Sequence, residues 1–362
     1  MATQYLAIVE ETTRGTDPTS GYIFLPVMNN IQPTVTYDDQ PRKEFRGADT
    51  ALGDSSVVRR SGQWTMSIEC AYYPGAETGL FFKHCLGKVV TRSVVDTTAY
   101  EGIMYPLSTL YGTGAELADK AIGIVPNTDE GGTTKSQYYG GGRVKSIVVT
   151  GTGTDDVKLT IEVMGPAEYI GTADQTATAG ATFPVAAPFS TDDCTLAIGA
   201  GISRTGTKPD FTALAVGSMP AYKPDSFTIT ITNGLDDKAV MDGVLGPNKT
   251  YRAAQFAVEV STPIDYEDPS SGFSSADQFK LTFSGPQTSS LWLKMDSGEV
   301  AGSSTTTYSS IFDLANLLIK PDTPARQSDG TQPTLTFAMS SLYSSTTDYP
   351  IGIFTTDKAS AY

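Results

Sequence analysis

The feature that most constrains this chain is a period of two in its apolar residues. In residues 63–70, apolar Trp, Met, Ile and Cys alternate with polar residues. The same pattern occurs at 143–150 and 157–164, on either side of the turn GTGTDD, and at 225–234. Because successive side chains of a strand point to opposite faces, each run predicts a half-buried β-strand, and the middle two predict a hairpin.

Composition supports a mainly β fold. The 35 glycines and 21 prolines favour short strands joined by turns over long helices. One short helix is expected near 80–85, where apolar residues recur at helical spacing before a capping glycine, Gly87. Ser274 predicts the N-cap of a second helical turn. Residues 311–319 fit either a strand or a short helix. Further strands are expected at 105–110 and 251–260.

A chain of 362 residues has room for two domains or for one elaborated β domain. The order strand, charged loop, strand and short helix occurs at 31–87 and again at 225–285, which indicates an internal duplication. Residues 171–187 are rich in Ala, Thr and Gly and read as a linker. We therefore expect a first β domain at 1–175, including an N-terminal arm, and a second at 176–362, including a C-terminal tail.

A long polar loop, 38–62, connects the strands expected at 31–37 and 63–70. It holds five of the chain's 25 basic residues and five acidic ones. Loops of this length are usually disordered or functional, and arginine suits contacts with another protein surface. A solvated surface loop is the alternative. The candidate contact residues between subunits are Arg42, Lys43, Glu44, Arg46, Asp49, Asp54, Arg59 and Arg60.

The formal charge of −15 and a pI near 4.5 disfavour tight binding of nucleic acid, which requires clustered Lys and Arg. An acidic surface suits a protein that lets DNA pass without sticking. No apolar run approaches 18 residues, so no membrane span is expected. The first residues lack a basic segment followed by an apolar core, so no signal peptide is expected and the chain should fold in the cytosol.

No enzyme signature is present. The three cysteines show no metal or disulfide spacing and are expected to be buried thiols. The single histidine, His84, is expected to pack in or beside the core. The acidic pairs at 155–156 and 192–193 suit turns. The segment GGGRVKS lacks the context of a phosphate loop and permits a backbone bend, and EDPSSGFSSAD lacks calcium-loop spacing. No cofactor or metal is expected.

Four segments carry a family resemblance. They are EETTRGT followed by YIFLPVM; VTYDDQPRKEFRG with VVRRSGQWTMSIEC and GLFFKHCLG; YYGGGRVKSIVVTGTGTDDVKLTIEVMG; and PFSTDDCTLAIG with SFTITITNGLDDK. Together they resemble the tail tube (major tail) proteins of long-tailed phages with non-contractile tails, in the form built from two tandem tube domains. The first three segments are similar to the arm, tube domain and hairpin, and the fourth to the start of the second copy.

The resemblance implies a structural virion protein of the phage tail, assembled in the host cytoplasm. Two tail-tube-like β-sandwich or barrel domains, each with a short helix, would form trimeric rings with pseudo-sixfold symmetry or hexameric rings. Stacked rings would make a hollow tube through which DNA passes on ejection without specific binding. The implied partners are further copies of the chain and the tape-measure and tail terminator proteins. The contact loop would reach the adjoining ring.

Two other functions remain open at this stage. A two-domain β-sandwich module that binds carbohydrate or attaches to a host fits the same composition. Its candidate aromatic platform is Tyr72, Tyr73, Tyr138 and Tyr139. A hydrolase on a β scaffold would need carboxylates that converge in space, and the sequence shows none.

Overall fold

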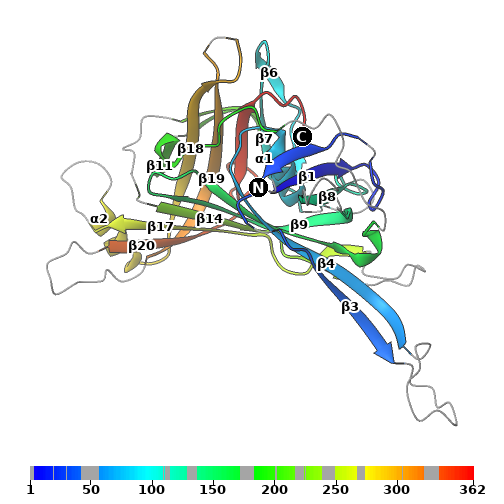
Figure 1. Cartoon of the computed structure of the whole chain (residues 1–362). Helices are drawn as coiled ribbons and strands as arrows, with labels where there is room; N and C mark the ends of the chain where they lie inside the picture. Colours follow the sequence, from blue (N-terminus) through cyan, green and yellow to red (C-terminus); the bar gives the residue numbers. More distant parts are fainter. Residues whose placement is uncertain are drawn as a thin grey trace, which may run out of the picture.

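The computed structural model shows a mainly β protein with two short α-helices among its described residues (Figure 1). The described residues are 4–18, 20–29, 31–41, 57–108, 110, 115–128, 137–171, 183–199, 202–216, 224, 226–238, 249–266, 274–303, 305–321 and 334–362. Seventeen strands from both halves of the chain join one large antiparallel sheet, so two separate domains are not resolved.

The first half of the chain supplies ten strands and one helix. They are β1 (Gln4–Glu11), β2 (Ile23–Pro26), β3 (Thr34–Pro41), β4 (Val57–Ala71), α1 (Ala76–Leu86), β5 (Gly87–Val89), β6 (Ser93–Asp96), β7 (Ala99–Pro106), β8 (Ala121–Thr128), β9 (Tyr139–Thr152) and β10 (Lys158–Pro166). A short 3-10 turn, η2 (Ala167–Tyr169), follows β10.

The second half begins with a 3-10 turn, η3 (Thr191–Asp193). Its further elements are β11 (Cys194–Ile198), β12 (Ile202–Thr207), β13 (Asp210–Val216), β14 (Ser226–Thr232), β15 (Leu235–Lys238), β16 (Lys249–Arg252), β17 (Ala257–Asp265), α2 (Ser275–Thr282), β18 (Gln287–Val300), β19 (Thr307–Pro321), β20 (Thr334–Ser341) and β21 (Gly352–Asp357). The pairs β12–β13 and β15–β16 form small separate sheets.

Six strands of each half lie in the same order. In the first half, neighbouring strands follow the order β1, β8, β9, β10, β4 and β3. In the second half, the order is β11, β18, β19, β20, β17 and β14. The helix follows the fifth strand in both halves, α1 after β4 and α2 after β17, and packs on the third, β9 or β19. The two halves therefore share one local topology.

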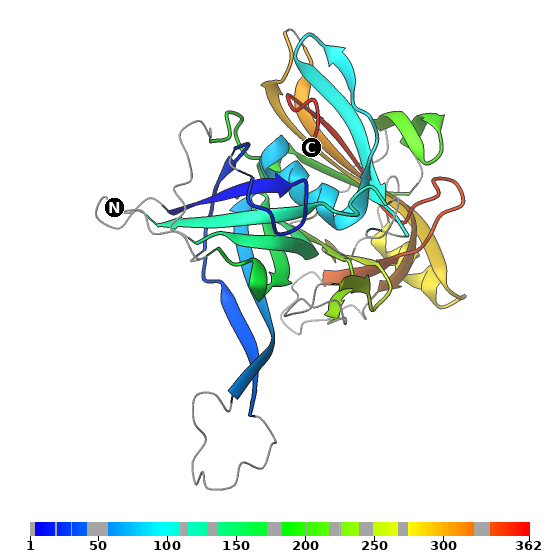
Figure 2. The ribbon, with the colours of Figure 1, turned by 90° about the vertical axis from the view of Figure 1, so that its right-hand side faces the viewer.

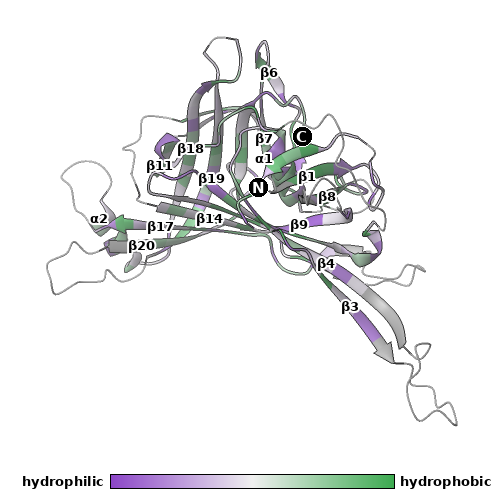
Figure 3. Ribbon diagram, viewed as in Figure 1, coloured by the Kyte–Doolittle hydropathy of each residue, from purple (hydrophilic) through white to green (hydrophobic). Residues whose placement is uncertain are grey.

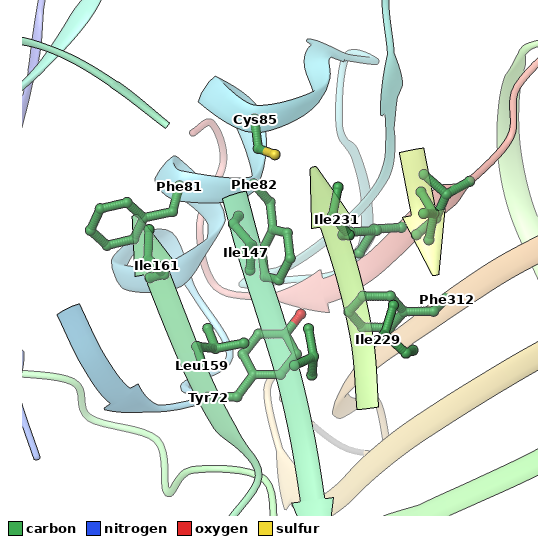
Figure 4. Close-up of a cluster of buried hydrophobic side chains, with 14 of the residues drawn as sticks. Tyr72, Phe81, Phe82, Cys85, Ile147, Leu159, Ile161, Ile229, Ile231 and Phe312 are labelled. Carbon is green, nitrogen blue, oxygen red and sulfur yellow. The ribbon is translucent and has the colours of Figure 1, made fainter. Parts of the chain in front are cut away.

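One hydrophobic core serves both halves. It includes Trp64 of β4, Phe82 of α1, Ile147 of β9, Ile231 of β14 and Phe312 of β19, all 4% exposed or less. Figure 4 shows side chains from both halves meeting beneath α1. The alternation read in the sequence produces this arrangement, because each strand turns its apolar set to the same buried face.

Several sequence predictions are confirmed. The runs at 143–150 and 157–164 form the hairpin β9–β10. The predicted helix is α1, and Gly87 caps it in the left-handed conformation with φ of 102°. The Ser274 side chain accepts a hydrogen bond from the Asp277 backbone N–H and so caps α2. Residues 311–319 form part of strand β19.

Three predicted boundaries are wrong. The loop expected at 38–62 is shorter, because β3 continues to residue 41 and β4 begins at residue 57; polar strands can pair in a solvated hairpin without an apolar alternation. The strand expected at 105–110 ends at Pro106, which has no N–H to continue the ladder. The strand expected from residue 251 is split, because Ala253 and Ala254 donate to the Gly234 carbonyl in a turn before β17.

The predicted linker at 171–187 is described only at residue 171 and from residue 183 onward. There, the ring of Phe183 lies 5.3 Å from that of Phe24, centroid to centroid, so this end of the segment contacts the first half. Among the described residues, neither helix is long and apolar enough to span a membrane.

Candidate functional site

The predicted contact loop belongs to the hairpin β3–β4, which extends away from the body of the molecule (Figures 1 and 2). Hydrophilic residues occur along both strands of this hairpin, whereas hydrophobic residues concentrate on β1 and α1 (Figure 3). Six of the eight candidate residues lie outside the described residues: Arg42, Lys43, Glu44, Arg46, Asp49 and Asp54. At Arg59 and Arg60, both in β4, only the backbone is described. Their contact role stays a prediction.

The base of the hairpin depends on a close approach at Gly62. A Cβ atom there would lie 2.5 Å from Cδ1 of Tyr37 and 2.8 Å from Cβ of Ala167, so only glycine fits. Tyr37 lies across Gly62 and still keeps 42% of its surface exposed. Val35, two residues earlier, lies opposite Trp64 and is half-buried. The strand β3 thus carries an apolar stripe that its own chain covers only in part.

Two strand ladders join the halves of the chain, β7 with β21 and β9 with β14; the second is called here the internal seam. Its pairs run from Thr152↔Ser226 to Ser146↔Thr232. The apolar residues Ile147, Val149, Ile229 and Ile231 are all 0% exposed. Seven consecutive antiparallel pairs with one buried face make a specific register, because a slip by one residue would expose the whole apolar set.

Helix α1 covers the internal seam. Figure 4 shows it above β9 and β14, with Phe82 directed toward Phe312 of β19. The ring centroids of Phe82 and Phe312 are 5.9 Å apart, and Tyr72 lies 5.5 Å from Phe82 and 6.3 Å from Phe312. The Tyr72 hydroxyl shares a hydrogen bond of 2.8 Å with Ser310, and burial raises the pKa of this tyrosine. The helix therefore binds both halves together.

Neighbouring strands form the row β3, β4, β10, β9, β14, β17, β20 and β19. At each end of this row, an edge of β3 and the last residues of β19 lack a strand partner among the described residues. On β3, one edge pairs with β4 and no described strand pairs with the other. On β19, the pairing with β18 ends at Ile319, so Lys320 and Pro321 pair only with β20. Exposed strand edges are sites at which another chain can add a strand.

The face of the sheet turned away from the core is polar. One row of directly paired residues crosses it from β4 to β20: Glu69, Thr160, Val148, Thr230, Glu259 and Ser340. Charged residues on this face include Lys145, Lys158, Lys320, Asp38, Glu69, Glu162, Glu259 and Asp265. Lys145 and Glu162 lie 4.0 Å apart, both about half-exposed. The described part of this face therefore offers no concentrated positive charge.

Two buried ion pairs connect β12 and the segment around Arg92 to strands of the large sheet. Arg204 of β12 donates to both carboxylate oxygens of Asp313 in β19, each at 2.7 Å, and the Tyr349 hydroxyl donates to the same carboxylate at 2.9 Å. Arg92 makes a similar forked contact with Asp357 of β21 at 2.9 and 3.0 Å. Burial lowers the pKa of both arginines, but Asp313 beside Arg204, and Tyr362 with Asp357 beside Arg92, outweigh burial and raise each pKa overall.

His84 is fully buried and packs in the core, as expected. Its Nε2 lies 3.1 Å from Oε1 of Glu10, which also meets Lys83 Nζ at 2.7 Å. Burial lowers the pKa of His84 to about 4, although Glu10 opposes this shift. Burial also raises the pKa of Glu10, but hydrogen bonds from His84 and Lys83 outweigh it and bring the pKa to about 2. This cluster holds α1 against β1.

The aromatic platform proposed for a binding module is wrong. Tyr72 and Tyr138 are each 2% exposed and Tyr139 is 8% exposed, so only Tyr73 reaches the surface, in part. The segment around residues 140–142 instead forms the expected bend: Gly141 has φ of 69° and donates its N–H to the Glu11 carboxylate. The tyrosine rings are therefore part of the core, and the Glu11 carboxylate of β1 already accepts the Gly141 N–H that an anionic ligand would use.

The described residues show no chemistry that suggests catalysis. Cys70, Cys85 and Cys194 are free thiols, and burial raises the pKa of each to about 12. No group of three or more His, Cys, Asp or Glu residues in the described ranges could hold a metal ion.

A continuous sheet with open edges, a polar outer face and a protruding hairpin defines a structural protein suited to edge-to-edge association. The sequence profile of the phage tail tube proteins matches residues 1–339, and the chain belongs to this family. It is therefore a structural, non-enzymatic component of the virion tail that assembles with its own copies into a tube. A search of curated proteins found no match.

Proposed function

We propose that the chain polymerises as stacked rings into the hollow tube of a long, non-contractile phage tail, through which DNA passes on ejection. The observation that supports this best is the internal seam, because it joins one strand order edge to edge with a second copy of the same order. A contact that already joins two repeats within a chain can join repeats of different chains in the same way.

The chain comprises two tandem tail-tube-like domains, 1–175 and 176–362. The shared order of six strands supports this division, as does the helix placed after the fifth strand in each half. Under this correspondence, β9 is equivalent to β19 and β3 is equivalent to β14. The internal seam is then a contact between the third strand of the first domain and the sixth strand of the second.

Three chains form one ring with pseudo-sixfold symmetry. The open edge of β3 corresponds to the edge of β14 that pairs with β9, and the end of β19 at Lys320 and Pro321 corresponds to the end of β9 that β14 covers. Pairing β3 with β19 of the next chain removes both open edges at once, which closure into a barrel requires. Two domains per chain make three chains sufficient for six equivalent positions.

The polar face of the sheet lines the lumen. The carboxylates Glu69 and Glu259 lie on equivalent strands, and the lysines of this face are matched by acidic residues. Such a wall offers no cluster of cations to bind phosphates, and the overall charge of −15 adds a weak repulsion. DNA passes without specific binding.

Rings stack through the tip of the β3–β4 hairpin, with Arg42, Lys43, Glu44, Arg46, Asp49, Asp54, Arg59 and Arg60 as contact residues. Charges of both signs suit a contact that selects register more than affinity. The tape-measure protein occupies the lumen before ejection, and a terminator protein ends the stack. Assembly takes place in the host cytoplasm.

Negative-stain electron microscopy of the purified chain tests this function. Incubation at high protein concentration is expected to give regular hollow tubes or single rings with a central opening. A protein that stays monomeric by light scattering at every concentration and salt condition tested would contradict the proposal.

A further inference from the structure

We propose that helix α2 of one subunit packs over the apolar stripe of β3, Val35 and Tyr37, on the neighbouring subunit. The inference rests on the ring proposed above and adds a side-chain contact that the strand pairing alone does not specify. The contact is inferred by comparing the internal seam, where apolar side chains are fully buried, with the edge of β3 and the surface of α2, where they are not.

Inside the chain, side chains of α1 and of β14 belong to one buried core across the boundary between the halves. Leu80, Phe81 and Phe82 of α1 are 3% exposed or less. Ile229 and Ile231 of β14, which Figure 4 shows beneath α1, are 0% exposed. The helix of one half thus packs on the strand that pairs with the sixth strand of the other, and the apolar side chains of both elements are removed from water.

Helix α2 occupies the equivalent place in the second half but lacks this cover. It packs on β19, as α1 packs on β9, and buries Ala276. Leu281, however, is 46% exposed, and Phe283, just past the helix end, is 77% exposed. The ring of Phe283 lies 5.0 Å from Phe279, so the exposed ring extends an apolar cluster outward from the helix. Large exposed apolar groups side by side indicate a contact surface.

The apolar residues of β3 also lack full cover within their own chain. This strand is equivalent to β14, but its apolar residues are only partly covered: Val35 is half-buried and Tyr37 is 42% exposed. Val35 pairs directly with Trp64, whose side chain lies in the core, so this stripe faces the same side of the sheet as Ile229 and Ile231.

The two incomplete surfaces cannot meet within one chain. Helix α2 and β3 lie at opposite sides of the molecule (Figure 1). When β3 pairs with the end of β19 on a neighbour, β3 comes beside the strand on which α2 packs, as β14 comes beside β9 under α1. A second copy of this chain is therefore the occupant of the apolar surface of α2, and the contact is head-to-tail.

Exposed-residue variants and a cross-link test the contact. Phe283→Ser is expected to raise the protein concentration needed for assembly by about tenfold or more, since it removes a large buried ring from each interface. Tyr343→Ser is the matched control. Tyr343 is 63% exposed and lines a groove with Tyr105 and Leu107, so it faces the first half of its own chain. The control is expected to assemble within about twofold of the unsubstituted chain.

In a second experiment, a chain carrying both Tyr37→Cys and Phe283→Cys is assembled and treated with a short bismaleimide. Covalent dimers and trimers are expected on a denaturing gel. Each single variant and the unsubstituted chain, which contains the partly buried Cys194, set the background. Circular dichroism melting of each unassembled variant verifies its fold.

Normal assembly by Phe283→Ser, together with no cross-link above background, would overturn the contact while tubes formed by the unsubstituted chain still supported the proposed function. Absence of any assembly by the unsubstituted chain would instead overturn the proposed function, and the contact with it.

Discussion

Ile231 of β14 lies directly opposite Ile147 of β9, and neither side chain is exposed to solvent. This pair belongs to one of the two strand ladders, β9–β14 and β7–β21, that make a single sheet out of two similarly ordered halves. If either half unfolded, the buried isoleucine of the other half at this pair would be exposed to solvent.

We predict that Ile231→Ala lowers the free energy of unfolding by about 2–5 kcal/mol, because it leaves a cavity beneath α1. The chain has two tryptophans, Trp64 in the first half and Trp292 in the second. Urea unfolding followed by fluorescence in Trp64→Phe and Trp292→Phe backgrounds reports each half separately. Both halves should shift together; a shift confined to the second half would show that the seam does not couple them.

Arg204→Met should be strongly destabilising. It leaves the fully buried Asp313 carboxylate with the Tyr349 hydroxyl but without its cation, at a cost of about 3–5 kcal/mol. Lys208→Met, which loses an exposed contact with Asp348, should cost less than about 1 kcal/mol. Chemical denaturation of both variants measures the difference, and equal stabilities would refute the structural role of the buried pair.

Stability should fall as the pH drops from about 6.5 to 4. In the folded chain the pKa of His84 is about 4, against an ordinary value of 6.5, so the unfolded chain binds a proton that the folded chain refuses in this window. The loss approaches about 3 kcal/mol. Below pH 4.5, protonation of unfolded Glu10, whose folded pKa is about 2, adds a further loss.

His84→Gln isolates the first effect, since the chain has no other histidine. Its stability at pH 7 and pH 4.5, measured by urea unfolding of the unassembled protein, should differ less than that of the unsubstituted chain. An unchanged difference between the two pH values would assign the effect to other groups.

The combined substitution of Arg42, Arg46, Arg59 and Arg60 by Ala should leave a folded monomer that forms no tubes, because the charged tip of the hairpin supplies the contact between rings. Sedimentation and electron microscopy check assembly, and Lys208→Ala serves as a control for loss of positive charge. Tubes of normal length from the fourfold variant would remove the loop from the stacking contact.

The sequence was informative where burial imposes alternation. The strands β9, β10 and β14, the helix α1 and its cap at Gly87 could be predicted because each buries one face or requires a left-handed glycine. The hairpin β3–β4 was underestimated, since residues 38–41 and 57–62 pair although their sequence does not alternate between apolar and polar side chains.

The assembly surfaces were harder to predict. Nothing local marks the edge of β3 or the end of β19 as open, because an edge is defined by which strands lie beside it in space. The spacing of Phe279 and Phe283 was the available signal for the apolar surface of α2, but its exposure depends on how the helix packs on β19. Likewise, the pairing of Arg204 with Asp313 joins residues 109 positions apart.

The most direct test of the account is a cryo-electron microscopy reconstruction of assembled tubes that resolves strands. We predict three chains per ring, with β3 of each chain paired to the end of β19 on its neighbour in the manner of the internal seam. Six chains per ring, or a β3 edge that faces solvent in the assembled tube, would contradict it.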